Sequence, residues 1–484
     1  MTKIEKILAN NGPMLSGKLG ELLQTEQVSS DAARKQISRA NGRVKRKGGF
    51  FINKQYFLYL YSQENTNEFY ENLLLALKSS ARRLYHVIHA ITQNKGFMSE
   101  AELANYSCSP VKNLMGHKRI DTIMAHLIEL NFIIHDPENK LYKLNKQVFD
   151  SEQLDIQKSK AIEVARSFII DQFIDWARKI GLSSYNTGQA NGEFAKFQWA
   201  YTSPSYAGTM PIASKGKLLP GFIIADIFIQ SKASEDDISF FLDKLAIIRA
   251  IKGLPRFIPF LIIDSASDEA LAILKKQGVV VGFLDKLFGK GYSKMMQDLV
   301  TAVSNAGAIL KKNPDQFFQL LAKIKALVEG KTNNLRGDLF EMAVGYYFSK
   351  TAQSIDVGKK IWIETLLREL DVFAKYEEKV VIIECKSSKT PMTEEEAQKW
   401  CSKVTLLRQW LVSSDAYYDK RHVFELWSLG GFEENAKNTL EKASKAKKYN
   451  FIYFGKEEIL ARARQSNDQK FLKILNEYFI KEPI

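Results

Sequence analysis

The sequence lacks the features of a secreted or membrane-bound protein. It has three cysteines, Cys108, Cys385 and Cys401, whose number and spacing fit neither a disulfide framework nor a zinc site. Six scattered histidines offer no metal-binding cluster either. No apolar run approaches the ~20 residues that cross a bilayer, and the first residues lack the apolar core of a signal peptide. We therefore expect a cytoplasmic protein with no membrane partner.

The chain is long and basic. Its 484 residues exceed what one hydrophobic core organises, so we expect three or four domains. Hydrophobic residues make up 45% and aromatic residues 11%, which is typical of folded domains. The net charge of +14 is concentrated at the start, where residues 1–60 hold eleven Lys and Arg and four Asp and Glu, or 11 − 4 = +7. Such a segment favours a polyanionic partner.

Residues 1–65 have the pattern of three short helices followed by a hairpin. The expected helices cover residues 2–10, 16–24 and 32–40. A basic, glycine-tipped stretch then leads into an expected aromatic strand at 50–52, with a returning strand at Tyr56. This order resembles a winged helix-turn-helix, whose third helix enters the major groove of DNA while the wing follows the backbone. The resemblance predicts a set of DNA-binding residues: Arg34, Lys35, Arg39, Arg43, Lys45, Arg46 and Lys47.

A second winged-helix-like module is expected at residues 66–150. Two long helices and a capped helix at Ser99 precede a third helix at 119–131 and a hairpin. The third helix carries Asp121 and Glu129, which would repel phosphates. We therefore interpret this module as a spacer or protein-contact module, with a second DNA-reading module as the alternative.

Residues 161–310 alternate between helical and extended patterns, after a polar, lysine-rich linker at 150–160. Their order predicts an α/β domain of three layers. The same order recurs in the last third of the chain, which raises the hypothesis of an internal duplication. Asp226 lies where a nuclease would place an acid, but no Glu-x-Lys follows it. We expect a degenerate, nuclease-like domain without catalysis.

The strongest chemical signal lies in the last domain, 332–484. Residues 380–383 are all apolar, which predicts a central strand buried on both faces. Because side chains of a strand alternate, Glu384 and Lys386 share one face where the apolar run ends. Asp371, on the strand before, brings a second acid. Ionised groups at the end of a buried strand are costly to desolvate, so we expect them to pair or to bind a ligand.

A third acid, Glu341, lies on a helix expected at 335–350. Four-residue spacing places Gly337 and Gly345 on its face of the helix, one turn to either side. Glycine costs about 1 kcal/mol relative to alanine inside a helix. Two glycines around one carboxylate therefore indicate a close approach of the sheet or of a substrate, and the alternative is an exposed glutamate on an amphipathic helix. Asp338, in the first turn, is expected to serve the helix dipole.

The order helix, three strands, helix, strand, with Asp371 and Glu384-x-Lys386 at the strand ends, resembles the PD-(D/E)xK restriction-endonuclease-like superfamily. The resemblance implies a Mg²⁺ site, in which Mn²⁺ is an alternative ion. Asp371, Glu384 and the backbone carbonyl of Cys385 would hold the ion, with Glu341 as a further ligand.

The resemblance covers about residues 332–465 and implies roles for basic and polar side chains as well. Lys386 would orient the attacking water and offset negative charge in the transition state. Related nucleases often have a supporting polar residue on the next helix, where this chain has Gln398 and Lys399. Further along that helix, Lys403 would contact a phosphate or belong to a solvated face.

Together these patterns predict a multidomain protein with α+β winged helices at the N-terminus, followed by α/β three-layer domains with mixed sheets, the last restriction-endonuclease-like. The expected function is a Mg²⁺-dependent DNA endonuclease in restriction, defence against foreign DNA or repair, by analogy. Two-strand cutting needs two centres, which would suit a homodimer. Two alternatives stay open: a non-catalytic DNA-binding regulator or scaffold, and an RNA or single-strand nuclease.

Overall fold

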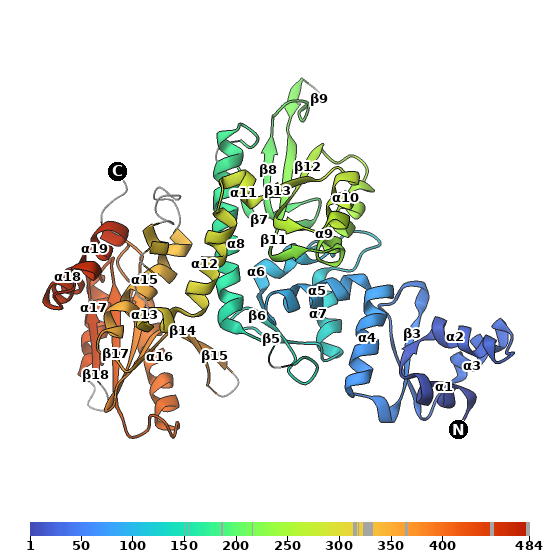
Figure 1. Cartoon of the computed structure of the whole chain (residues 1–484), viewed down its shortest axis with the longest axis horizontal. Helices are drawn as coiled ribbons and strands as arrows, with labels where there is room; N and C mark the ends of the chain where they lie inside the picture. Colours follow the sequence, from blue (N-terminus) through green and yellow to red (C-terminus); the bar gives the residue numbers. More distant parts are fainter. Residues whose placement is uncertain are drawn as a thin grey trace.

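The structure is a computed structural model. It describes residues 1–150, 152, 154–184, 187–214, 216–312, 317, 319–322, 333–363, 366–445 and 450–480. The chain forms several domains of mixed α and β structure, with antiparallel and mixed sheets (Figure 1). Residue 332, the predicted start of the last domain, lies outside the described residues. None of the helices in these residues has the length and apolar character that a bilayer crossing requires.

The first module packs three helices beside a three-stranded sheet. Its elements are α1 (Lys3–Asn11), β1 (Met14–Leu15), α2 (Ser16–Thr25), α3 (Ser30–Arg39), β2 (Val44–Gly48) and β3 (Tyr56–Leu60). Strand β3 lies between β1 and β2 and is antiparallel to both. The predicted strand at 50–52 is wrong, because the basic segment β2 is itself the strand. Phe51 instead turns into a core that it shares with the second module.

The second module has four helices and a hairpin, in the predicted order. Its elements are α4 (Asn67–Ser80), α5 (Arg82–Gln93), β4 (Phe97–Ser99), α6 (Glu100–Leu103), α7 (Ile120–Glu129), β5 (Ile133–Asp136) and β6 (Leu141–Leu144). Strand β6 pairs with β4 and β5, both antiparallel. A long helix, α8 (Ile156–Lys179), follows and stands between the two large sheets (Figure 1). Asp155 caps this helix by accepting the N–H of Lys158, so the second half of the predicted linker is helical.

The middle domain is a five-stranded mixed sheet with helices on its faces. The sheet strands are β7 (Gln189–Phe194), β8 (Phe197–Ser205), β11 (Gly221–Ala233), β12 (Phe257–Ala266) and β13 (Val280–Phe283), and a separate hairpin holds β9 (Ile212–Ser214) and β10 (Lys217–Leu219). The helices are α9 (Glu235–Arg249), α10 (Asp268–Lys276), α11 (Leu284–Phe288), α12 (Tyr292–Ser304) and α13 (Ala306–Lys312).

The last domain is a second five-stranded mixed sheet. Its strands are β14 (Ser354–Ile363), β15 (Leu366–Lys375), β16 (Lys379–Lys386), β17 (Arg421–Ser428) and β18 (Asn450–Phe454). Its helices are α15 (Asn333–Ser349), α16 (Glu394–Val412), α17 (Glu434–Ser444), α18 (Lys456–Gln465) and α19 (Gln469–Ile474).

The two five-stranded sheets have the same topology. The first is ordered β7-β8-β11-β12-β13 and the second β14-β15-β16-β17-β18. In both sheets, the two strand pairs before the central strand are antiparallel. The central strand and the two strands after it are parallel to one another. In both, a helix follows the central strand, α9 after β11 and α16 after β16. The topology therefore agrees with the predicted internal duplication.

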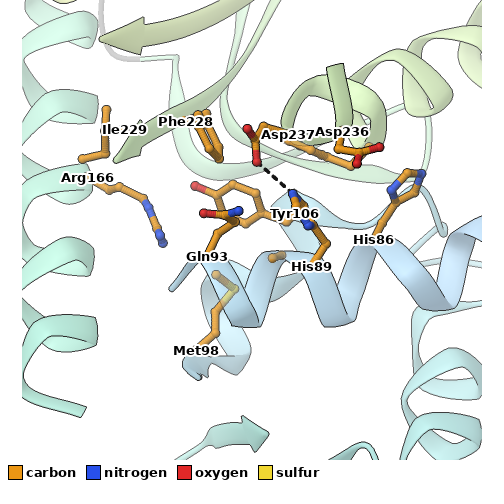
Figure 2. A pocket seen from close by; sticks show the side chains of 12 residues that line it. His86, His89, Gln93, Met98, Tyr106, Arg166, Phe228, Ile229, Asp236 and Asp237 are labelled. Atoms are coloured by element: carbon orange, nitrogen blue, oxygen red, sulfur yellow. Dashed lines mark hydrogen bonds and ion pairs between the residues drawn. The ribbon is translucent and has the colours of Figure 1, made fainter. Parts of the chain in front are cut away.

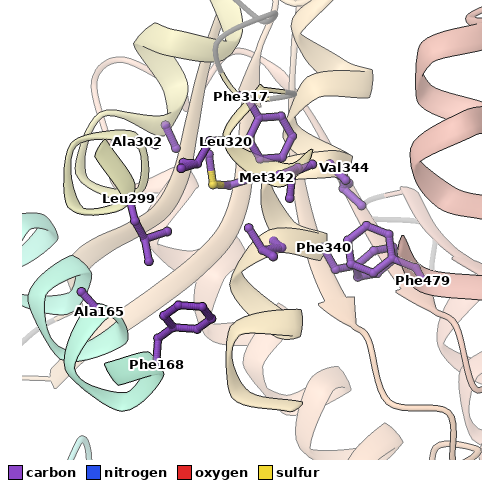
Figure 3. Close-up of a cluster of buried hydrophobic side chains, with 14 of the residues drawn as sticks. Ala165, Phe168, Leu299, Ala302, Phe317, Leu320, Phe340, Met342, Val344 and Phe479 are labelled. Carbon is purple, nitrogen blue, oxygen red and sulfur yellow. The ribbon is translucent and has the colours of Figure 1, made fainter. Parts of the chain in front are cut away.

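One hydrophobic core joins the middle and last domains. Figure 3 shows Ala165 and Phe168 of α8 with Leu299 of α12 on one side of this core, and Phe340 of α15 beside Phe479 on the other. Phe168 and Phe340 are 1% and 0% exposed, and each fully buried side chain of this size contributes about 1.5–3 kcal/mol. Helix α15, which carries Glu341, is thus fixed between α8 and its own sheet.

The two glycines around Glu341 have different surroundings. A Cβ at Gly345 would lie 2.7 Å from Val357 Cγ2 and 3.1 Å from Leu310 Cδ1, so the sheet approaches the helix closely there. At Gly337 the nearest atom is Ser387 Oγ, at 4.0 Å. The predicted close approach is therefore found at Gly345, whereas Gly337 borders open space.

We expect Gly345→Val to lower the free energy of unfolding by about 1–3 kcal/mol, because the added methyl groups would overpack the contact with β14. The matched change Gly337→Val should stay within about 0.5 kcal/mol of the parent chain. Urea unfolding followed by circular dichroism measures both. Equal losses in the two variants would contradict this difference in packing.

Candidate active site

Asp371 and Glu384 lie together where the pairing between strands β15 and β16 ends. The pairing of these strands runs from Lys375↔Val380 to Val372↔Ile383, and Asp371 and Glu384 are the next residues on each side. The N–H of Cys385 donates to Asp371 Oδ2 at 2.7 Å, in place of a strand partner. Opposite, on β14, Gly358 has a φ of 62°, which lets the β14–β15 ribbon bend at this point.

Glu384 is held by two lysines. It is 9% exposed, and its Oε1 lies 3.1 Å from Lys386 Nζ while its Oε2 accepts a hydrogen bond of 2.8 Å from Lys403 Nζ. Burial alone would raise the pKa of Glu384, but the ammonium groups of Lys403 and Lys386 lower it below its usual value. Lys386 remains 41% exposed, so its side chain can also reach a ligand.

Lys403 was predicted to contact a phosphate or solvent, but in the structure it supports Glu384. The predicted supporting residues, Gln398 and Lys399, lie on the outer face of α16. Gln398 donates to Glu394 at 3.1 Å, and Lys399 pairs with Glu395 at 2.7 Å while remaining 73% exposed. Helix side chains point back toward the helix start. Only one turn further along does a lysine reach the sheet, so both supporting assignments are corrected to Lys403.

Glu341 lies in a second acidic group beside this pair. Lys160, on α8 of the preceding domain, lies 3.3 Å from Asp338 and 3.8 Å from Glu341, and it also bonds Glu369. Burial raises the pKa of Asp338, and Lys160 opposes this rise. The prediction that Asp338 serves the helix dipole therefore misses its ion pair.

Burial also shifts the central acids toward the neutral form. It raises the pKa of Asp371 to about 7, with the charge of Glu384 adding to the effect. It raises the pKa of Glu341 well above the usual value, again helped by a neighbouring acid, Asp371. The thiol of Cys385 packs into the apolar core, and burial raises its pKa too. This thiol is therefore no nucleophile at neutral pH.

The donor set fits a hard divalent cation. Asp371, Glu384 and a backbone carbonyl offer the oxygen ligands that Mg²⁺ prefers. Burial raises the pKa of Asp371, and a bound divalent cation would offset the same cost of burying its charge as a proton does. Glu341 lies on the Asp371 side of this group and is coupled to it electrostatically.

Another cluster also has potential metal ligands. Within the described ranges, the group of three His, Cys, Asp or Glu ligand atoms that all lie within 4.8 Å of one another belongs to His86, Cys108 and Asp243, and not to the acids of the candidate site. However, Asp243 accepts a hydrogen bond of 2.8 Å from His86 Nε2 and pairs with Arg82 Nε at 2.9 Å. The other ring nitrogen of His86 lies 3.3 Å from Ser239 Oγ. These polar contacts and the adjacent cation account for the cluster without a metal.

The second module and the start of α8 both contact the β14–β15 ribbon that carries Asp371. Gln157 donates to the carbonyl of Gly358 and Asn139 to that of Leu367, each at 2.6 Å. Arg368 pairs with Glu138 at 2.7 Å, and Lys143 lies 3.8 Å from the centre of the Trp362 ring. Residues 66–150 thus contact the last domain within the chain, and their role as a spacer or protein-contact module stays a prediction.

The middle domain has a related but closed pair. Asp226 of β11 and Lys244 of α9 lie 2.6 Å apart with both side chains 0% exposed. Lys244 and Lys403 each lie ten residues after the N-cap of their helices (244 − 234 = 403 − 393 = 10). Where the last domain has Asp371, the middle domain has Ala200, whose N–H donates to Asp226 at 2.9 Å. The middle domain thus has one acid here and no second acid at the position of Asp371, and the absence of catalysis at Asp226 stays a prediction.

Helix α5 covers the carboxyl end of the same strand. Figure 2 shows His89 and Gln93 of α5 pointing toward Phe228 and Asp237, and His89 Nε2 lies 2.8 Å from Asp237 Oδ1. Phe228 lies two residues after Asp226, just as Lys386 lies two residues after Glu384. The middle domain therefore has a phenylalanine where the last domain has this lysine. The place that is open to a ligand in the last domain is therefore covered in the middle one.

The predicted DNA-binding residues fall into two groups. Six are exposed, namely Arg34, Lys35, Arg39, Arg43, Lys45 and Arg46, and Lys47 is half-buried. Arg46 and Lys47 have partners within the chain. Arg46 donates to the carbonyls of Ser38 and Ala40, at 3.2 and 2.7 Å, and so closes the end of α3. Lys47 lies 3.5 Å from Glu64.

No protein-family model and no curated protein matches the chain. Among solved structures, the chain is similar to protein VC1899 from Vibrio cholerae, with a TM-score of 0.18 and 10% sequence identity. The match covers 46% of this chain and 55% of that one, so it spans about half the length of the relative. A similarity of this size carries no argument about fold or function.

Lys403→Met should lower the free energy of unfolding by about 2 kcal/mol or more, since it leaves Glu384 buried beside one lysine instead of two. The control Lys399→Met removes an exposed pair and should change it by less than about 0.5 kcal/mol. Chemical denaturation near pH 7 makes the comparison. Similar values for both variants would contradict the assignment of Lys403.

The stability of the metal-free protein should fall as the pH rises from about 4, the unfolded pKa of Asp371, to its folded pKa of about 7. The folded pKa of Asp371 is raised to about 7, above the unfolded value near 4. The bound proton therefore stabilises the fold at low pH, and this contribution is lost as the pH passes 7. With a chelator present, Asp371→Asn should be more stable than the parent chain at pH 8 by about 1–3 kcal/mol and not at pH 4. Asp415→Asn, in an exposed turn, is the control, and an equal gain in both variants would show that the buried charge of Asp371 is not the cause.

Proposed function

We propose that the chain is a divalent-metal-dependent nuclease that hydrolyses phosphodiester bonds of DNA. One observation carries the proposal: Asp371 and Glu384 meet at the edge of the sheet, and Lys386 reaches solvent beside them. The helix, three strands, helix, strand order of the last domain supports its likeness to the PD-(D/E)xK superfamily. This fold alone would not fix a function.

The site residues suit such a reaction. Asp371, Glu384 and the carbonyl of Cys385 would hold Mg²⁺ or Mn²⁺, which supplies Lewis-acid activation of the phosphodiester and of a bound water. The Cys385 N–H orients Asp371, and Lys403 fixes one oxygen of Glu384. Lys386 is exposed enough to meet the attacking water and the developing charge on the phosphate.

Lys160 makes the site depend on two domains. It is the cation beside Glu341 and Asp338, and it comes from α8 rather than from the last domain. Removing it would leave those acids unneutralised, so the centre is complete only with α8 in place.

The first module suits DNA as the substrate. Its three helices and basic hairpin support the likeness to a winged helix, and the exposed cations Arg34, Lys35, Arg39, Arg43 and Lys45 on and beside α3 and β2 would meet phosphates. Cutting both strands would need two centres, as in a homodimer. Restriction, defence and repair are the biological settings by analogy.

One observation favours the alternative of a non-catalytic scaffold. Both oxygens of Glu384 are already held by lysines, and the middle domain has the same topology with its own acid closed off by Lys244. A cation would have to displace Lys386 or share the carboxylate with it.

A cleavage assay separates these possibilities. Plasmid DNA with Mg²⁺ should be cut by the parent chain and by Lys399→Ala, and about 10²–10³-fold more slowly by Glu384→Ala and Lys386→Ala. Equal rates in all four proteins would contradict the site. No cleavage of DNA or RNA by the parent chain would favour the scaffold, and preferential cleavage of RNA or single strands would replace duplex DNA as the substrate.

A further inference from the structure

A hollow continues along the sheet edge next to the candidate active site. Strands β16, β17 and β18 are parallel, so their carboxyl ends share the edge that carries Lys386. The hollow, of about 590 Å³, lies beyond the ends of β17 and β18, and we name it the edge hollow. Ligands of sheets with parallel strands gather at this kind of edge. Its lining includes Arg336, Lys389, Gly430, Gly431, Lys437, Gly455 and Lys456.

The loops that form the edge hollow are tied to the strand of the candidate site. The N–H of Leu429 donates to the carbonyl of Lys386 at 2.9 Å, and that of Met392 to the carbonyl of Gly431 at 3.0 Å. A Cβ at Gly430 would lie 2.0 Å from the carbonyl oxygen of Thr390, so only glycine fits there. The edge hollow is therefore held at a fixed place relative to Lys386.

Cations dominate its lining. Arg336, Lys389, Lys437 and Lys456 face two acids, Glu457 and Glu458, which leaves 4 − 2 = +2. Arg336 donates through Nη2 to the carbonyl of Phe479 at 2.6 Å, which holds its guanidinium in the lining. A phosphate oxygen is the acceptor that a guanidinium matches best.

Two helix starts add backbone donors. Helix α17 begins after Glu433 and α18 after Gly455, and neither residue caps its helix through a side chain. The first N–H groups of a helix have no partner within it, and together with the helix dipole they favour an anion. Glu434 in the first turn of α17 and Glu457 and Glu458 in the first turn of α18 already place carboxylates at these two starts, so a bound phosphate depends on the cations of the lining. Gly455 and Lys456 place the start of α18 in the lining itself.

We propose that the edge hollow is a phosphate subsite that holds a phosphodiester of the nucleic-acid strand, one or more nucleotides away from the bond at Lys386. This proposal rests on the proposed function, because that function identifies the bound strand as nucleic acid. The subsite fixes the direction in which the strand crosses the domain, from the end of β16 toward the ends of β17 and β18. It adds affinity along the backbone without reading bases.

The salt dependence of strand binding tests the subsite. The double variant Lys437→Gln/Lys456→Gln removes two exposed cations of the edge hollow. Lys442→Gln/Lys445→Gln makes the same charge change near the far end of α17. Affinity of the full chain for a labelled oligonucleotide is measured by fluorescence anisotropy without divalent cations, at several salt concentrations. Thermal unfolding of both variants verifies that they fold like the parent chain.

We expect the edge-hollow variant to lose about 0.7–0.9 from the slope of log K against log salt, the value for one phosphate contact. We also expect at least a several-fold weaker affinity, with the control variant unchanged. Equal slopes and affinities in the two variants would overturn the subsite. A second result would also overturn it: inorganic phosphate stabilises the parent chain against thermal unfolding, but the edge-hollow variant binds the oligonucleotide as tightly as the parent chain. The hollow would then hold a free anion and not the strand.

The result is separable from the fate of the nuclease proposal. A changed slope in a chain that cuts no nucleic acid would uphold the subsite and refute the nuclease. Cleavage that depends on Glu384, together with slopes equal to the control, would uphold the nuclease and overturn the subsite.

Discussion

The last domain depends on keeping five carboxylates, those of Asp338, Glu341, Glu369, Asp371 and Glu384, at one edge of a buried sheet. Ionised groups in such a place are strongly destabilising unless they are paired, protonated or bound to a cation. The chain uses the first two means. Lys160, Lys386 and Lys403 come from three different elements, and burial raises the pKa values of Asp371 and Glu341, which favours their protonated forms.

Comparison of the two sheets shows what distinguishes an open centre from a closed one. In the middle domain a single carboxylate, Asp226, meets a single lysine, Lys244, and both are sealed from solvent. Its charge is balanced, so nothing is left for a cation to neutralise. In the last domain Asp371 and Glu341 add carboxylates that the lysines do not fully offset, and Lys386 reaches solvent. The imbalance is what makes the last domain the candidate for chemistry.

Sequence periodicity predicted the parts of the site that lie on one strand or one helix. Alternation along β16 placed Glu384 and Lys386 correctly, and the spacing of Gly345 indicated the close approach of the sheet. It could not find Lys160, because 181 residues separate it from Glu341 (341 − 160) and only the shared core brings α8 to the site. The sequence predicted Lys399 as the supporting residue, whereas Lys403 is the lysine that contacts Glu384. Helical spacing alone does not tell which turn of α16 faces the sheet. The strand predicted at 50–52 failed since Phe51 packs on another module, which local pattern does not reveal.

If the buried acids form a divalent-cation site, locating a bound ion tests this most directly. Crystals of the full chain grown with Mn²⁺ would show an anomalous-difference peak at the ion. We expect one strong peak in contact with Asp371 and Glu384, and its loss in Glu384→Ala crystals. A peak at His86, Cys108 and Asp243, or none near β15 and β16 at millimolar Mn²⁺, would contradict a cation site at the buried acids.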